Sequence, residues 1–182
     1  MKILSESDIV SSQRSSVFVQ DYSPQPRIDG VQIADIRRHV GPDGSFEELF
    51  RLDKGIAEGF PEFEVKQINR SRLLPGCIKA WHLHYTQEDV WYAEPEDHLI
   101  LGLWDVRENS PTKDQKMKIV LGSGHSRLVY IPRGVAHGVA NFSPRAGVVF
   151  YFINQQFNLK DPDERRLPWD ACGADFWEVE KG

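Results

Sequence analysis

Short runs of β-branched and aromatic residues, separated by turn-forming sequences, dominate this 182-residue chain and leave little of it for helix. Val, Ile, Phe, Tyr and Trp favour strands, and the Gly, Pro, Asp and Ser between the runs favour tight turns. Many short strands with almost no helix predict an all-β sandwich or small barrel. The strands that we predict are Ser16–Tyr22, Val31–Arg38, Phe63–Arg70, Cys77–Leu83, Val90–Ala93, His98–Val106, Met117–Leu121, Arg127–Ile131, Val135–Asn141 and Gly147–Ile153.

Helix is predicted only in short peripheral pieces. The candidates are Phe46–Leu52, which contains a pair of glutamates, and part of Asp161–Arg166. From Asn154 onward the charged sequence indicates an extended C-terminal tail on the outside of the barrel. No repeat, low-complexity tract or linker interrupts the chain, so we expect one domain over residues 1–182.

The charge balance argues against two classes of partner. A formal net charge of −5 and a pI near 5.7 are unsuited to a surface that binds nucleic acid or an anionic membrane. The N-terminus lacks the pattern of a signal peptide, and the longest apolar run, Ala146–Ile153, is far too short to span a bilayer. Two cysteines, Cys77 and Cys172, suit a reducing compartment. We therefore expect a cytoplasmic protein with neither a nucleic-acid nor a membrane partner.

Histidines recur on two of the predicted strands. His82 and His84 lie two residues apart, so on a strand their side chains leave on the same face. Glu88 follows them, and a turn at Pro132-x-Gly134 precedes His137 on a later strand. Imidazole both binds metals and exchanges protons near neutral pH. The sequence therefore predicts one pocket in which these histidines either hold a metal or move protons.

The spacing fits the two motifs of the cupin superfamily, which are small β-barrels with an active site inside the barrel. The first motif contains His82, His84 and Glu88, and the second contains His137 and Asn141. Three neutral imidazoles and a carboxylate suit iron, manganese, nickel or zinc. One interpretation is therefore a metal-dependent cupin, an isomerase or an oxygenase, with His82, His84, Glu88 and His137 as ligands.

Two longer stretches resemble the dTDP-4-dehydrorhamnose 3,5-epimerase family, cupin enzymes of nucleotide-sugar biosynthesis that work without a metal. The strings that carry the resemblance are Gln67-x-Asn69, Ile78-Lys-Ala-Trp-His82, Asp105-Val-Arg-Glu-Asn-Ser-Pro-Thr112 and Leu128-Val-Tyr-Ile-Pro-Arg-Gly-Val-Ala-His137-Gly. The resemblance implies a cupin-type jelly-roll barrel with no cofactor. It also implies a nucleotide-sugar substrate, a 4-keto-6-deoxy sugar nucleotide.

The same resemblance assigns roles to residues of the predicted pocket. In the family, a histidine at the position of His82 removes the proton next to the sugar ketone. A carbon acid beside a carbonyl needs a base whose pKa lies near the working pH, and imidazole provides one. Substrate contacts are implied for Gln67 and Asn69 by hydrogen bonds, for Lys79 at the diphosphate, and for His137 as a lining residue.

Three departures from the family affect the expected mechanism. Phe150 stands where the family has its proton-donating tyrosine, and the adjacent Tyr151 is expected on the opposite face of the strand. The family's lysine corresponds to about Val90, and the aspartate that pairs with the base lies in a C-terminal segment that this chain is expected to lack. We therefore expect inversion at one carbon or a ketoisomerisation, with His84 as a second proton carrier and Phe150 lining the pocket.

A third interpretation is a sugar-binding cupin without chemistry. Barrels of this kind bury exposed sheet edges by pairing with a second copy. We therefore expect a homodimer that exchanges Ser16–Tyr22 or Val31–Arg38.

Overall fold

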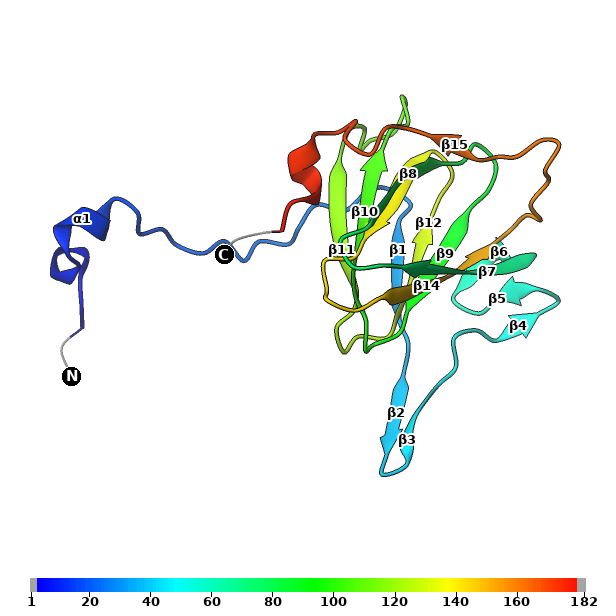
Figure 1. Ribbon diagram of the computed structural model, residues 1–182, viewed down its shortest axis with the longest axis horizontal. Helices are drawn as coiled ribbons and strands as arrows, with labels where there is room; N and C mark the ends of the chain where they lie inside the picture. Colours follow the sequence, from blue (N-terminus) through cyan, green and yellow to red (C-terminus); the bar gives the residue numbers. More distant parts are fainter. Residues whose placement is uncertain (1–2, 180–182) are drawn as a thin grey trace.

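The computed structural model describes residues 3–179, and its regular secondary structure is almost entirely antiparallel β-strand (Figure 1). Two five-stranded sheets face each other as a jelly roll, which confirms the all-β barrel. The first sheet has the strand order β1 (Gln32–Asp35), β12 (Arg127–Ile131), β9 (Asp89–Ala93), β14 (Gly147–Ile153) and β7 (Gln67–Leu73). The second has the order β11 (Lys116–Gly122), β10 (His98–Asp105), β13 (Val135–Ala140), β8 (Ile78–Leu83) and β15 (Arg165–Arg166).

Smaller elements lie around the two sheets. A hairpin of β2 (Arg38–Gly41) and β3 (Gly44–Glu47) projects from the barrel, and β4 (Leu52–Asp53), β5 (Ile56–Ala57) and β6 (Phe60–Glu64) form a separate small sheet (Figure 1). The helical elements are the short peripheral η1 (Glu6–Asp8), α1 (Ser11–Arg14) and η2 (Ala174–Trp177). Within residues 3–179, no helix is long and apolar enough to cross a membrane.

Three apolar clusters hold these layers together. The first fills the space between the two sheets and contains Leu99, Leu101 and Val129. The second lies between the first sheet and the β4–β6 sheet, and is built on aromatic residues such as Phe152. The third covers the outer face of the second sheet, where Trp81 packs against residues of the C-terminal tail. Both faces of each central strand are therefore packed against other parts of the protein. Because side chains alternate along a strand, an odd or even position decides whether a residue points between the two sheets or to the outside of its own sheet.

Most predicted strands are confirmed, and two of them, Arg127–Ile131 and Gly147–Ile153, have the predicted bounds. Phe63–Arg70 is divided, because β6 ends at Glu64 and β7 begins at Gln67. Ser16–Tyr22 is wrong as a strand: this segment runs away from the barrel and pairs with no strand of the described chain (Figure 1). Without a partner strand, β-propensity alone does not form a ladder.

Both predicted helices are also wrong. Phe46–Leu52 begins in β3, because the turn at Gly41–Gly44 closes a hairpin in which His39 pairs with Phe46. In Asp161–Arg166, the last two residues form β15, which pairs with Leu83 and His82 at the edge of the second sheet. The expected course of the tail, extended along the outside of the barrel, is confirmed (Figure 1).

Candidate active site

A cavity of about 490 Å³ lies between the two sheets, next to the central apolar cluster. The first sheet contributes Gln67, Asn69 and Tyr151, and the second contributes Lys79, His82 and His137. Every one of the predicted pocket residues in this set therefore lines the cavity, together with Tyr151, which was not predicted to do so. The two sheets form the main walls of the cavity, and Phe157 and Glu164 of the C-terminal tail complete its lining.

A β-bulge in β8 brings Lys79 and His82 to the same cavity. His82 pairs with His137 and Lys79 with Val139, so three steps along β8 oppose two along β13. Without the extra residue, positions 79 and 82 would face opposite sides of the sheet. Gly138 lies opposite the bulge, where an added Cβ would be only 2.4 Å from Ala80 Cβ. Glycine at position 138 therefore allows the backbones of β13 and β8 to approach closely at the bulge.

His82 is held by a carboxylate from the tail. Its Nδ1 lies 2.5 Å from Glu164 Oε1, and Arg166 Nη1 lies 3.3 Å from the same oxygen. Burial would raise the pKa of Glu164, but the hydrogen bond and charge of His82 outweigh it and lower the pKa to about 2. The expectation that the chain lacks a C-terminal carboxylate for the base is therefore wrong. Pairing of β15 with β8 supplies it.

His84 is fixed by the same tail segment. Its Nδ1 contacts the backbone carbonyl of Asp163, whose carboxylate accepts backbone hydrogen bonds from Tyr85 (3.0 Å), Thr86 (2.7 Å) and Gln87 (2.8 Å). Burial would raise the pKa of Asp163, but these hydrogen bonds outweigh it and lower the pKa to about 2. The loop after β8, and with it the His84 ring, is thereby tied to the tail.

His137 lies at the bottom of the cavity, 2% exposed, beside the equally buried Asp89. Its Nδ1 donates to the carbonyl of Val135 at 3.0 Å, and its Nε2 lies 3.6 Å from Asp89 Oδ2. Burial lowers the pKa of His137, although the charge of Asp89 opposes the effect. The indole of Trp91 donates to Asp89 Oδ2 at 2.9 Å and packs edge-on against the His137 ring.

The predicted ligand set of His82, His84, Glu88 and His137 is wrong in its carboxylate. The three histidines do come together, with the His137 ring 5.9 Å from that of His82 and 5.2 Å from that of His84. Glu88, however, precedes β9 on the other face, where its carboxylate pairs with Arg133 at 3.4 Å. Asp89, one residue later, takes its place beside the histidines.

The residue of β14 that faces the cavity is Tyr151 and not Phe150, so the prediction was wrong by one position. Phe150 packs with Tyr92 in the cluster behind the first sheet, so it does not line the cavity. Tyr151 faces the cavity instead, with its ring 5.9 Å from Trp91. Burial raises the pKa of Tyr151, and the charges of Asp89 and Glu164 add to the effect. The phenol is therefore protonated at neutral pH and able to donate.

The predicted substrate-binding residues of the upper cavity are close to one another. Gln67 donates to Asn69 at 2.8 Å and accepts from the backbone of Phe157 at 2.9 Å, which fixes both amides. Lys79 Nζ donates to Ser71 Oγ at 2.8 Å and to the carbonyl of Arg72 at 3.1 Å. Two oriented amides and one cation thus lie along one side of the cavity.

The family follows from comparison with known proteins. A model of the dTDP-4-dehydrorhamnose 3,5-epimerase family matches residues 25–176. The spore coat polysaccharide biosynthesis protein SpsL of Bacillus subtilis is 37% identical over 154 residues, which cover 84% of this chain and 98% of SpsL. The chain belongs to the dTDP-4-dehydrorhamnose 3,5-epimerase family.

Two further relatives agree. The probable low-salt glycan biosynthesis epimerase Agl13 of Haloferax volcanii is 28% identical over 156 residues, covering 85% of this chain and 97% of Agl13. The crystal structure of a dTDP sugar isomerase from Desulfovibrio desulfuricans G20 superposes with a TM-score of 0.69 at 26% identity, covering 79% of this chain and 87% of that one. Membership of this epimerase family establishes that the chain is an enzyme.

Sequence reasoning missed several residues of this epimerase site, and for different reasons. Glu164 and Asp163 were missed because a charged tail offers no periodicity that predicts contact with a distant strand. Asp89 and Tyr151 were missed because the neighbouring residues Glu88 and Phe150 were predicted to face the cavity in their place. Alternation along β14 offered no signal for Tyr151, because Val149 and Ile153 on its face and Phe150 and Phe152 on the other face are all apolar.

The carboxylate of Asp163 is expected to stabilise the fold in a pH-dependent manner. Asp163→Asn should lower the free energy of unfolding at pH 7 by about 1–3 kcal/mol, because three backbone N–H groups lose a charged acceptor. Since the pKa of Asp163 is about 2 when folded and 3.8 ordinarily, its contribution is present above pH 3.8 and is lost as the pH falls towards 2. Urea unfolding should therefore show the variant and the native protein converging over that interval. Asp161→Asn, an exposed aspartate of the same tail, is the control; an equal loss in both variants would contradict the assignment.

Proposed function

We propose that this enzyme epimerises a 4-keto-6-deoxy sugar nucleotide, with His82 as the base that removes the proton next to the ketone. The observation that carries the proposal is the pair formed by His82 and Glu164 on one wall of the cavity, opposite Tyr151 on the other. A base and an acid on opposite sheets can act on opposite faces of one sugar ring. That arrangement favours inversion over the ketoisomerisation that we also considered.

The base requires an oriented imidazole. Glu164 accepts from Nδ1 of His82, so Nε2 is the nitrogen that takes up the substrate proton, and the carboxylate stabilises the imidazolium that forms. Arg166 Nη1 contacts Nε2 at 3.0 Å and has to move aside when the substrate binds. The C–H bond breaks, the proton moves to His82, and the electron pair enters the carbonyl to give an enolate. Return of a proton to the same carbon from the opposite face completes inversion without any net oxidation or reduction.

Tyr151 is the proposed proton donor for that second step. Its phenol is protonated at neutral pH and borders the same cavity from β14. The hydroxyl transfers its proton to the enolate carbon on the face away from His82, and solvent or the neighbouring polar groups return a proton to the phenolate. Phe150 at the place of the family's tyrosine therefore does not leave the enzyme without a proton donor.

Substrate binding is proposed to use the other polar side of the cavity. Gln67 and Asn69 hydrogen-bond sugar hydroxyls, since their amides are already oriented by each other. Lys79 meets the diphosphate as a point charge, and its ammonium is held in place by Ser71.

A cytoplasmic location is also proposed. Cys77 and Cys172 are free thiols, which suit a reducing compartment.

Substitution of the base should abolish proton exchange. His82→Asn is expected to lose incorporation of solvent deuterium into a dTDP-4-keto-6-deoxy sugar, and Glu164→Gln to slow it without abolishing it, because the imidazole remains but loses its orienting carboxylate. NMR in deuterated water measures both. His98→Asn, on the outer side of the barrel, is the control and should exchange at the native rate. Undiminished exchange in His82→Asn would remove this residue from the mechanism.

Substitution of the acid should separate exchange from inversion. Tyr151→Phe is expected to reduce formation of the inverted product about 10²–10⁴-fold, while His82 still removes and returns the proton on its own face. Product stereochemistry by NMR distinguishes the two outcomes. The matched control is Tyr92→Phe, whose hydroxyl donates to Glu47 behind the first sheet. Native inversion by Tyr151→Phe would show that another residue donates.

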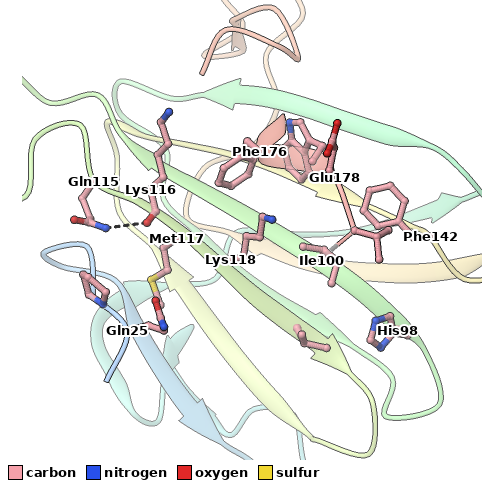
Figure 2. A pocket seen from close by; sticks show the side chains of 14 residues that line it. Gln25, His98, Ile100, Gln115, Lys116, Met117, Lys118, Phe142, Phe176 and Glu178 are labelled. Atoms are coloured by element: carbon pink, nitrogen blue, oxygen red, sulfur yellow. Dashed lines mark hydrogen bonds between the residues drawn. The ribbon is translucent and has the colours of Figure 1, made fainter. Parts of the chain in front are cut away.

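We also propose a homodimer. The N-terminal segment runs away from the barrel (Figure 1). Its Phe18, Val19 and Tyr22 are 78%, 94% and 89% exposed. A groove of about 760 Å³ lies on the outer face of β10 and β11. Met117 and Phe142 border it (Figure 2). The N-terminal segment of a second copy would cover apolar surface there, at the unpaired edge of β11. The second exchange candidate, Val31–Arg38, already pairs through β1 with β12 of its own chain.

The dimer can be tested by removing the segment. Deletion of residues 1–22 is expected to convert a dimer to a monomer in sedimentation equilibrium, because it removes the exposed apolar side chains that a partner would bury. Replacement of Phe18, Val19 and Tyr22 by Ser should have the same effect at full length. A monomeric native protein, or an unchanged dimer in both variants, would contradict this interface.

A further inference from the structure

The guanidinium of Arg166 lies against the proposed base. Its Nη1 is 3.0 Å from Nε2 and 3.1 Å from Nδ1 of His82, and 3.3 Å from Oε1 of Glu164. Arg166 lies opposite His82 in the pairing of β15 with β8, so both side chains leave on the same face. Nε2 is the nitrogen that receives the substrate proton, so the guanidinium blocks the approach of a sugar to the base.

The contacts that hold Arg166 over His82 can be exchanged at low cost. The Arg166 side chain is 51% exposed, and β15 is the outermost strand of its sheet, so no further strand confines the guanidinium. Its ion-pair partner, Glu164, is 40% exposed. Pairs between groups as exposed as these contribute little free energy. A stronger anion within reach of the side chain would therefore draw it off the imidazole.

The cavity is short of positive charge for a sugar nucleotide. The diphosphate of such a substrate carries two negative charges, whereas Lys79 is the one permanent cation among the described residues that line the cavity. The same lining includes the carboxylates of Asp89 and Glu164. Arg70 and Arg72 of β7 alternate with lining residues, so they point to the other face of the sheet. A second cation for the diphosphate therefore has to come from beside the cavity.

Arg166 is placed to be that second cation. β15 runs antiparallel to β8: Arg166 lies opposite His82, and the next residue, Leu167, exchanges backbone hydrogen bonds with Trp81. The tail therefore proceeds from the base toward the end of β8 that carries Lys79. A guanidinium also matches phosphate oxygens with a fork of donors that an ammonium lacks. Release from the imidazole would bring Arg166 toward the diphosphate that Lys79 meets.

We propose that Arg166 makes the base respond to the nucleotide: its guanidinium leaves His82 for the substrate diphosphate, and only then is Nε2 open to the sugar. This proposal rests on the proposed epimerase function and adds a residue that determines specificity. A sugar without a diphosphate enters the cavity but does not draw Arg166 away. Arg166 therefore discriminates against 4-keto sugars that carry the same reactive carbon and no nucleotide.

The experiment compares a dTDP-4-keto-6-deoxy sugar with the methyl glycoside of the same sugar, which lacks the diphosphate. NMR follows deuterium exchange into both. Arg166→Met should exchange the glycoside roughly tenfold faster than the native protein does, because the base is no longer covered. For the dTDP sugar the same variant should raise KM about 10–100-fold, because charge-assisted hydrogen bonds to the diphosphate are lost. Added inorganic pyrophosphate should accelerate exchange of the glycoside by the native protein and not by Arg166→Met.

The neighbouring arginine provides a matched control. Arg165 lies over the ring of Tyr85 at 5.3 Å, on the other face of β15, so Arg165→Met should treat both substrates as the native protein does. Opposite shifts for the two substrates in Arg166→Met distinguish the proposal from a structural ion pair with Glu164, whose loss would affect both alike. A glycoside exchanged no faster by Arg166→Met than by the native protein would overturn the proposal. Absence of exchange into the dTDP sugar by the native protein would instead contradict the epimerase function itself.

Discussion

The pairing of the C-terminal tail with β8 is the interaction on which the site depends. Trp81 and Leu167 exchange backbone hydrogen bonds at 3.2 Å, and the indoles of Trp81 and Trp177 both donate to the carbonyl of Trp169 at 3.0 Å. These aromatic contacts bury the outer face of β8. On the inner face, the same alignment places Glu164 against His82. Packing on the outer face of β8 thus fixes the orientation of His82, the proposed base, on the inner face.

The two facing sheets give the chemistry its geometry. The second sheet and its tail hold His82, the proposed base, and the first sheet holds Tyr151, the proposed acid, so the two groups belong to separate sheets. Little conformational change is then needed to bring them to opposite faces of a bound sugar, which keeps the cost of alignment low. The bulge opposite Gly138 also contributes, because it directs the side chains of Lys79 and His82 to the same face of β8, toward the cavity.

The sequence predicted the barrel and the position of its histidines well, since both depend on local alternation. His82 and His84 share a face because they are two positions apart, and β12 and β14 have their predicted bounds. Contacts of the tail could not be predicted, because Glu164 is far from His82 in sequence and carries no periodic signal. The sequence also could not show which face of a strand meets the cavity when both faces are apolar. The strand that contains Phe150 and Tyr151 is such a case, because alternation alone does not distinguish its two faces.

The same alternation along a strand separates two adjacent carboxylates. Glu88 faces away from the cavity, where Arg133 balances its charge at 3.4 Å. Asp89 faces the bottom of the cavity and is 2% exposed. There Gln87 and Trp91 donate hydrogen bonds to its two oxygens at 2.8 and 2.9 Å, so the buried carboxylate is satisfied by fixed donors. A shift of one strand position therefore decides whether a carboxylate forms an ion pair near the surface or becomes part of the hydrogen-bond network under the cavity.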